Sequence, residues 1–403
     1  MTEPTVPSAR GTALEVLSAF LKLGLSAFGG PIAHLGYFRE EFVARRRWLD
    51  EATFADLVAL CQFLPGPASS QAGFAIGLLR AGPLGALAAW AGFTLPSAAL
   101  MTAFAFGAAA LHGPVAQGLV HGLKLVAVAI VAQAVFGMAR TLTPDARRAG
   151  IALGALIVVT AAAASLGQVA AIGLGAMAGL WLCRDGSAAV RAGHDLGVPK
   201  WVGLAALGLY LLLLLGGPVL AGATGWIGLS RFDAFYRAGA LVFGGGHVVL
   251  PLLKQAVVDP GWIDQNAFLA GYGAAQAVPG PLFTVSAFLG AAMRGPPDGV
   301  AGAALALVAI FLPGLLALLA ALPFWSQLRA RPSAQAAMRG ANAAVVGILA
   351  SALYNPVWTS AVLDPADFAA ALTGFALLTA FRAPPILVVF LGAGFGLARG
   401  FMV

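Results

Sequence analysis

Residues 24–30 read GLSAFGG and residues 62–67 read QFLPGP, and both stretches recur in the second half of the chain. The second copies are GALVFGG at residues 239–245 and QAVPGP at residues 276–281. The separation is 215 residues for the glycine pairs and 214 residues for the Pro-Gly-Pro turns. Duplication with helix-breaking residues at matched positions is typical of secondary transporters, in which broken helices bind the substrate.

The composition predicts an integral membrane protein. Sixty per cent of the residues are hydrophobic and 10% are charged, whereas soluble domains contain about 25% charged residues. Residues 1–10 contain no apolar run, so no cleavable signal peptide is expected. Cys61 and Cys183 lie in or beside apolar runs, which predicts neither a disulfide framework nor a metal cluster. The net charge of +7 comes from arginines in loops and indicates no nucleic-acid-binding patch.

Apolar stretches predict four membrane-spanning helices in each half and one between the halves, because a span needs about 20 apolar residues. These stretches are residues 83–107, 114–139, 148–165 and 168–183, then 201–220, then 298–322, 334–356, 366–381 and 384–401.

Shorter arms surround the helix breakers of the first half. Residues 53–64 and 68–80 flank the Pro-Gly-Pro turn, and each arm reaches only about 18–20 Å as a helix. Residues 12–28 and 31–44 flank the first glycine pair in the same way. Such arms form either re-entrant hairpins or kinked spans.

The distribution of arginines favours the hairpins, because short cytoplasmic loops are enriched in Lys and Arg. Residues 39–47 and 140–148 are basic, while residues 108–114 contain no Lys or Arg. If residues 53–80 crossed the membrane once, the two basic loops would lie on opposite sides. A re-entrant hairpin places both in the cytoplasm.

The bias is reversed in the second half. Its copy of the uncharged loop, residues 323–333, carries two arginines, while residues 357–365 carry no Lys or Arg. The second half is therefore predicted to be inverted, and the additional span at residues 201–220 supplies the odd crossing.

We therefore predict an all-α integral membrane protein with two inverted-topology repeats. Each repeat has two re-entrant or broken helical hairpins and four transmembrane helices, and an extra transmembrane helix joins the repeats. The predicted segments are a cytoplasmic tail (1–11), the first repeat (12–183), a segment with a cytoplasmic linker, the inverting helix and an external stretch (184–231), and the second repeat (232–403).

The helix breaks predict an anion site, because a helix N-terminus presents unpaired N–H groups and the positive end of the helix dipole. Glycine pairs add further exposed backbone N–H groups. Inverted repeats would bring both breaks together near the middle of the membrane. The alternative is that the breakers only kink packed helices. The predicted substrate-binding residues at the breaks are Gly29, Gly30, Gly66, Pro67, Ala68, Ser69, Ser70, Gly244, Gly245, Gly280, Pro281 and Thr284.

Three basic residues within apolar stretches are also predicted to bind the substrate: Lys22, Lys124 and Arg237. Lys22 and Arg237 each precede a glycine pair by seven residues. A charge at the bilayer centre costs about 2.5–3.5 kcal/mol, so such residues usually face a cavity or a partner. The alternative is that their long stems carry the charge to the interface. No Asp or Glu is expected at comparable depth, which predicts a preference for a multiply charged anion.

Three histidines are candidates for proton coupling, because histidine titrates near physiological pH. His34 and His247 each lie within a few residues of a glycine pair, and His121 precedes Lys124 by three residues. The alternative for each is a packing role.

The combination of these motifs resembles the chromate transporter family over nearly the whole chain. Phe-Gly-Gly is followed by Trp-Leu-Asp at residues 48–50 and by Trp-Ile-Asp at residues 262–264, and Gln-x-x-Pro-Gly-Pro occurs in both halves. The resemblance implies the long, two-domain form of the family. It implies an inner-membrane carrier that expels chromate and confers chromate resistance, powered by the membrane gradient, with sulfate as the structural mimic.

Two other functions are alternatives. One is a carrier for the uptake or exchange of sulfate or another oxyanion. The other is an intramembrane enzyme, which is disfavoured because the sequence has no His-Glu-x-x-His, Gly-x-Ser-x-Gly or phosphate-binding loop motif. No cofactor or metal is predicted. The expected partners are a small inorganic oxyanion and the lipid bilayer, and a homodimer is left open.

Overall fold

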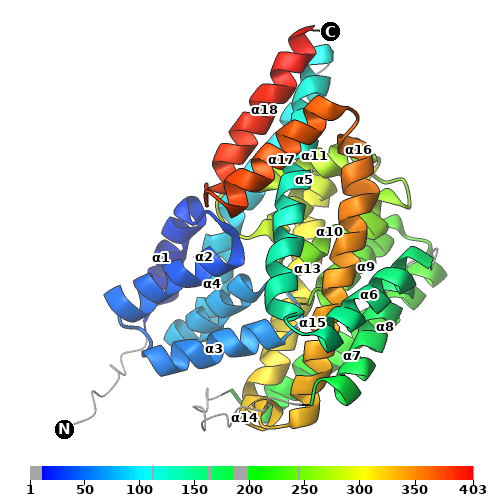
Figure 1. Cartoon of the computed structure of the whole chain (residues 1–403). Coiled ribbons are helices and arrows are strands. Elements are labelled where there is room, and N and C mark those ends of the chain that lie inside the picture. The colour runs from blue at the N-terminus through cyan, green and yellow to red at the C-terminus, as the bar shows by residue number, and fades with distance from the viewer. Residues whose placement is uncertain (1–10, 111–112, 162–165, 185–197, 244–245, 403) are drawn as a thin grey trace.

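A computed structural model describes residues 11–110, 113–161, 166–184, 198–243 and 246–402 (Figure 1). Every regular element in these residues is helical, as predicted. Five helices among them are long and apolar enough to span a membrane.

The first repeat contains seven α-helices. They are α1 (Ala13–Ser26), α2 (Gly30–Phe38), which continues as a π-helix (Arg39–Arg45), α3 (Glu51–Phe63), α4 (Ala68–Ala110), α5 (Pro114–Leu142), α6 (Ala146–Ala161) and α7 (Leu166–Leu182). Helix α8 (Lys200–Thr224) then joins the repeats and covers the predicted span at residues 201–220.

The second repeat follows the same order with shorter pieces near its breaks. Its elements are α9 (Ile227–Ala240), α10 (Val249–Leu253) between short 3-10 (Gly246–Val248) and π (Lys254–Val258) turns, α11 (Gln265–Ala275), α12 (Val285–Ala292) after a 3-10 turn (Leu282–Thr284), α13 (Gly299–Ala321), α14 (Trp325–Arg329), α15 (Pro332–Ala352), which continues as a π-helix (Leu353–Trp358), α16 (Thr359–Ala361), α17 (Pro365–Thr379) and α18 (Pro385–Met402).

The aspartate of each Trp-x-Asp motif begins a helix at the equivalent place in both repeats. The side chain of Asp50 accepts the N–H of Thr53 at 2.7 Å at the start of α3. Asp264 accepts the N–H of Ala267 at 3.0 Å at the start of α11. A carboxylate in this position satisfies one of the unpaired N–H groups of the first turn. The two motifs therefore fix where the helices leading into the Pro-Gly-Pro turns begin.

Helix α4 consists of two arms that fold back on each other, because Ala81 and Gly82 have non-helical backbone angles. The arms meet so closely that a Cβ on Gly77 would lie 2.3 Å from the carbonyl oxygen of Gly85. The second repeat has the same arrangement, since a Cβ on Gly290 of α12 would lie 2.1 Å from the carbonyl oxygen of Gly302 of α13. Residues 68–80 therefore end at a sharp turn, as predicted for a hairpin arm.

Equivalent helices of the two repeats run in opposite directions. Helix α5 begins beside the C-terminal end of α18 and runs away from it, whereas its equivalent, α15, runs toward that end of the molecule (Figure 1). Likewise, the second arm of α4 runs toward the end of the molecule where α18 ends, whereas its equivalent, α13, runs away from that end. The predicted inversion of the second repeat is therefore confirmed.

Helices of the two repeats also pack directly against each other. The last helix of each repeat packs on the long helix of the other, α18 on α5 and α7 on α15. Glycines make both crossings close: a Cβ on Gly122 would lie 2.1 Å from the carbonyl oxygen of Gly392, and one on Gly340 would lie 2.1 Å from that of Gly175. Small residues at such crossings let membrane helices approach backbone to backbone. The two halves therefore form one interlocked body.

Four of the predicted spans form helices that are shorter than a straight membrane crossing. Helices α6, α7, α17 and α18 contain 16, 17, 15 and 18 residues, whereas a straight crossing needs about 20 residues. The last predicted residues of the span 148–165 lie outside the described part of the chain. Helix α8 is long enough, and it exposes a row of large apolar side chains, including Leu212, Leu215 and Val219.

Candidate anion site at the helix breaks

The two Pro-Gly-Pro turns meet the other repeat through equivalent hydrogen bonds. The N–H of Gly66 donates to the carbonyl oxygen of Val242 at 2.7 Å, just before the glycine pair of the second repeat. The N–H of Gly280 donates to the carbonyl oxygen of Ala27 at 2.9 Å, just before the glycine pair of the first repeat. Each proline turn is thus joined to the residues just before the glycine pair of the opposite repeat. Both proline turns, the first glycine turn and the residues that precede the second glycine pair therefore come together at one crossing.

Glycine is required at both turns. Gly66 and Gly280 have φ angles of 117° and 95°, a region that side chains rarely tolerate. A Cβ on Gly66 would lie 2.8 Å from the Cα of Gly314, and one on Gly280 would lie 2.8 Å from Oγ of Ser97. Gly314 and Ser97 directly follow the matched prolines Pro313 and Pro96. The residues that follow two prolines inside α4 and α13 therefore pack against the turns.

The first turn presents the start of α4. The first hydrogen bond of this helix runs from the N–H of Gln71 to the carbonyl oxygen of Pro67, so the N–H groups of Ala68, Ser69 and Ser70 have no acceptor within the helix. Ser70 is 2% exposed, and its hydroxyl has no hydrogen-bond partner within the described chain. A buried hydroxyl beside free N–H groups is a fitting set of donors for an oxyanion.

Gln71 holds this turn in place. Its side-chain amide donates to the carbonyl oxygens of Pro65 at 2.9 Å and of Gly314 at 2.8 Å. The side chain of Gln71 is therefore a clamp between the first proline turn and α13.

The second turn differs in detail. Thr284 does not offer a free hydroxyl, because its Oγ1 donates to the carbonyl oxygen of Pro281 at 2.8 Å. The unpartnered hydroxyl on this side belongs to Ser286, which is fully buried. Ser286 is not among the residues that the sequence predicts to bind the substrate. The repeat alignment pairs Thr284 with Ser70, and this hid the shift of two residues.

His34 connects the first glycine turn to α4. Its Nε2 lies 3.2 Å from the carbonyl oxygen of Ala27, and because a carbonyl only accepts, Nε2 carries the proton and donates. Its Nδ1 lies 3.3 Å from Oγ of Ser69, so the Ser69 hydroxyl donates to it when the ring is neutral. Gly29 and Gly30, with φ angles of 102° and 78°, turn the chain into α2. His34 therefore belongs to the crossing.

The described residues that flank the second glycine pair lie near the same crossing. Gly244 and Gly245 lie outside the described residues. Next to them, a Cβ on Gly246 would lie 3.6 Å from Pro31 and 3.9 Å from Leu282. His247 lies one residue further, and its Nδ1 is 2.9 Å from the hydroxyl of Tyr272 in α11.

The predicted basic residues do not join this crossing. Lys22 is exposed on α1. Arg237 is 45% exposed at its side chain and forms an ion pair with Asp233 at 3.0 Å. The ammonium of Lys124 donates a hydrogen bond to Asn266, which lies in the first turn of α11. The proline turn follows the other end of that helix. The three basic residues occupy three separate places.

Two buried carboxylates lie near these cations, whereas the sequence predicted no Asp or Glu at comparable depth in the membrane. Asp233 is 5% exposed and pairs with Arg237, and Asp367 is fully buried and lies 2.7 Å from Nε2 of His121. Asp233 and Arg237 are four residues apart on α9, a spacing that brings side chains together, so this pair was readable from the sequence. The contacts of Asp367 could not be predicted from the sequence, because its partners His121 and Arg399 come from α5 and α18.

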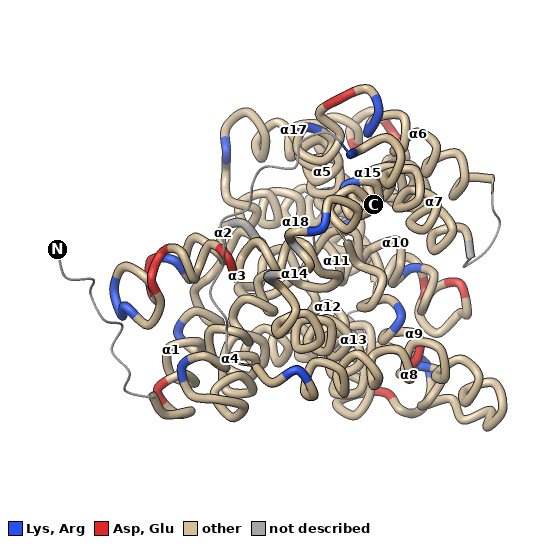
Figure 2. The backbone as a smooth tube through the Cα atoms, turned by 90° about the horizontal axis from the view of Figure 1, so that it is seen from below, with Lys and Arg blue, Asp and Glu red and all other residues tan. Residues whose placement is uncertain are grey.

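The two central helices of the second repeat, α12 and α13, carry no charged residue. Lys, Arg, Asp and Glu lie mainly toward the rim of the molecule, and none lies on α12 or α13 in its centre (Figure 2). An anion at the crossing would thus be bound by backbone N–H groups, hydroxyls and helix N-termini.

The chain is similar to known transport proteins over most of its length. The family described as Chromate transporter matches residues 14–180 and 229–397, which are the two repeats. A "Probable chromate transport protein" of Synechococcus elongatus is 29% identical over 84% of this chain and 83% of its own length. The "Chromate transport protein" of Cupriavidus metallidurans is 27% identical, over 92% and 89%, and that of Pseudomonas aeruginosa 26% identical, over 94% and 90%. No solved structure matches the chain.

Proposed function

Because this chain belongs to the chromate transporter family, we propose that it exports chromate across the inner membrane and confers chromate resistance. It is a multi-pass membrane transport protein. In our proposal the dianion binds where the two Pro-Gly-Pro turns meet, the membrane gradient drives its export, and the N-terminus is cytoplasmic. A carrier that takes up or exchanges sulfate remains the second candidate, since sulfate has the same shape and charge.

One observation carries the proposed position of the site. Each proline turn donates a hydrogen bond to the carbonyl oxygen two residues before the glycine pair of the other repeat. Each turn is followed by a helix start with a buried hydroxyl, Ser70 or Ser286, that has no partner among the described residues. Substrates of inverted-repeat carriers bind at discontinuous helices between the repeats. Because Gly66 and Gly280 use their own N–H groups in these bonds, the residues after the turns are the proposed ligands.

Transport assays with purified protein in proteoliposomes test the site. We expect Gly66→Ala and Gly280→Ala to abolish chromate uptake into vesicles, because a methyl group would push the turn away from Gly314 or Ser97. Gly82→Ala is the matched control, since Gly82 also has a positive φ angle but has nothing within 4 Å of an added Cβ. Equal transport by all three variants, each eluting as a monodisperse protein, would contradict the proposed site.

Substrate and direction need separate measurements. Competition between chromate and sulfate in the same vesicles ranks the two anions. Cells that express the protein should accumulate less radiolabelled chromate than cells that express the Gly280→Ala variant. Greater accumulation would favour the uptake carrier.

A further inference from the structure

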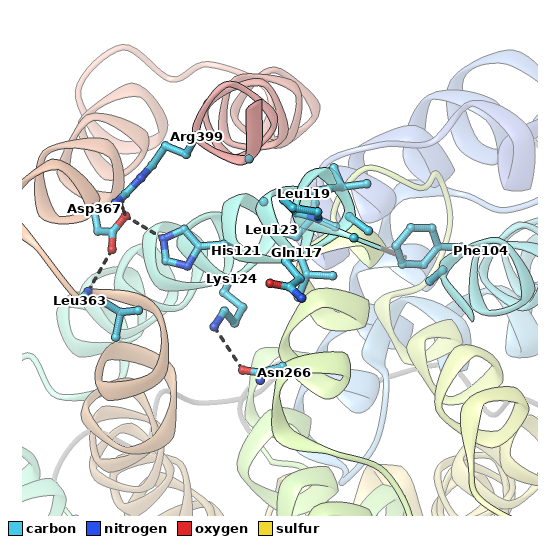
Figure 3. Close-up of a pocket in the computed structure, with 17 residues that line it drawn as sticks. Phe104, Gln117, Leu119, His121, Leu123, Lys124, Asn266, Leu363, Asp367 and Arg399 are labelled. Atoms are coloured by element: carbon cyan, nitrogen blue, oxygen red, sulfur yellow. Dashed lines mark hydrogen bonds and ion pairs between the residues drawn. The ribbon is translucent and has the colours of Figure 1, made fainter. Parts of the chain in front are cut away.

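A second polar site lies in a cavity of about 640 Å³ at the end of the molecule that carries the C-terminus (Figure 3). Gln117, His121 and Lys124 line it from α5, at a spacing that places all three on one face of the helix. Asn266 faces them from α11, and Asp367 and Arg399 complete the polar wall. The cavity thus combines residues of both repeats.

Lys124 is a buried cation without an ion-pair partner. It is 7% exposed, and its ammonium donates only to neutral oxygens, Oδ1 of Asn266 at 3.1 Å and the carbonyl oxygen of Ser360 at 2.8 Å. Asp264 and Asp367 are the nearby acidic residues, but neither forms an ion pair with it in the described chain. Buried charges in membrane proteins are normally paired or face a functional cavity.

Asp367 forms no direct ion pair with Lys124, because its carboxylate is already engaged by other groups. It accepts hydrogen bonds from Arg399 at 2.7 Å, from the N–H of Leu363 at 3.0 Å and from His121 at 2.7 Å. Arg399 also pairs with Asp364. The two aspartates and the arginine therefore hold each other and His121, which lies between Asp367 and Lys124 (Figure 3). Among the described residues that line the cavity, Lys124 is therefore the cation that forms no ion pair with a carboxylate.

Two helices connect this cavity with the crossing of the breaks. The second arm of α4 passes Ser97, against Gly280, and reaches the cavity at Phe104. Helix α11 leads from Asn266 at the cavity toward the second proline turn. Seven residues of α4 and the eleven residues of α11 correspond to about 10–16 Å at 1.5 Å per residue. The cavity is therefore a separate place, about one short helix away from the crossing.

We propose that this cavity is a second binding site for a free inorganic oxyanion, with Lys124 as its charged ligand. The amide N–H groups of Gln117 and Asn266 supply further donors around it, and the ring of His121, which donates to Asp367, lines the same wall. The site lies between the crossing and the end of the molecule where the α16–α17 connection and the start of α5 meet. In the transport cycle, the cavity is the site that the anion occupies at that end of the molecule. The choice of a dianion rests on the proposed function.

The test is the number of sulfate ions bound by purified, delipidated protein in detergent, measured by equilibrium dialysis with radiolabelled sulfate. We expect two ions per chain for the wild type and for Lys124→Arg, and one for Lys124→Gln. Lys254→Gln is the matched control, because Lys254 pairs with Asp259 at 2.8 Å and lines a different cavity. It should bind two.

Asn266→Asp tests the same charge without removing the lysine. The new carboxylate would lie against the ammonium of Lys124 and neutralise it while preserving the contact. We expect this variant to bind one sulfate ion, with thermal stability at least equal to that of the wild type. Two ions bound by both Lys124→Gln and Asn266→Asp would overturn the proposal.

The outcomes also separate this site from the crossing. Gly280→Ala should lose the other ion and keep the Lys124-dependent one. If Gly280→Ala binds as the wild type does while Lys124→Gln loses an ion, the second site stands and the proposed crossing site falls. A wild type that binds no sulfate overturns both sites. Displacement of the Lys124-dependent sulfate by phosphatidylglycerol would make the cavity a lipid-headgroup site and overturn the free-anion proposal.

Discussion

Ser70 follows the first Pro-Gly-Pro turn by three residues, and its buried hydroxyl has no partner within the described chain. We expect Ser70→Ala to weaken chromate binding by about 2- to 12-fold, because one hydrogen bond contributes about 0.5–1.5 kcal/mol. Thermal stability should not fall, since no protein contact is lost. Ser26→Ala is the control, because the Ser26 hydroxyl is exposed and bonds to its own helix. An unchanged KM for chromate would mean that the anion does not contact Ser70.

Arg237 was predicted to bind the substrate, but its contact with the buried Asp233 indicates a structural role as well. Arg237→Ala should lower the free energy of unfolding by about 1–3 kcal/mol. This is less than the roughly 3–5 kcal/mol of a fully buried pair, because Arg237 is half exposed. Asp233→Asn combined with Arg237→Ala should restore most of the stability, measured by thermal unfolding in detergent.

The same pair of variants separates the two roles of Arg237. If the double variant is stable and transports chromate, Arg237 only neutralises Asp233. If it is stable but inactive, Arg237 acts on the anion as first predicted.

At the scale of the elements, the crossing of α5 and α18 depends on glycine. A Cβ on Gly122 would lie 2.1 Å from the carbonyl oxygen of Gly392, so the helices must separate to admit it. We expect Gly122→Ala to destabilise the protein by about 1–3 kcal/mol through overpacking. Gly137→Ala on the same helix has nothing within 4 Å of its added Cβ and should be neutral or slightly stabilising. Equal melting temperatures for the two variants would show that this crossing is loosely packed.

At the scale of the whole molecule, the orientation in the membrane is testable with single cysteines. In a variant lacking Cys61 and Cys183, Leu363→Cys should react with a membrane-impermeant maleimide in intact cells. Leu363 is 70% exposed and follows α16. Arg47→Cys, in the basic loop between α2 and α3, should react only after permeabilisation. Reaction of Arg47→Cys from outside would reverse the proposed orientation and the position of the N-terminus.

The sequence by itself determined the class, the duplication and the positions of the helix breaks. These depend on local properties: the length of an apolar run, the backbone freedom of Gly66 and Gly280, and the rigidity of the adjacent prolines. The repeated order of these signals then required the second half to resemble the first. The count of arginines in the loops predicted its inversion, which the opposite directions of α5 and α15 bear out.

The tertiary structure decided which polar residues meet. The contact of Lys124 with Asn266 joins residues 142 positions apart, and that of His121 with Asp367 joins residues 246 apart. Neither contact follows from helical spacing within one segment, because both depend on how the helices of one repeat pack against those of the other. For the same reason the sequence placed Lys22, Lys124 and Arg237 in one site. Depth in the membrane is encoded along the chain, whereas the direction in which a side chain points is set by the helices packed around it.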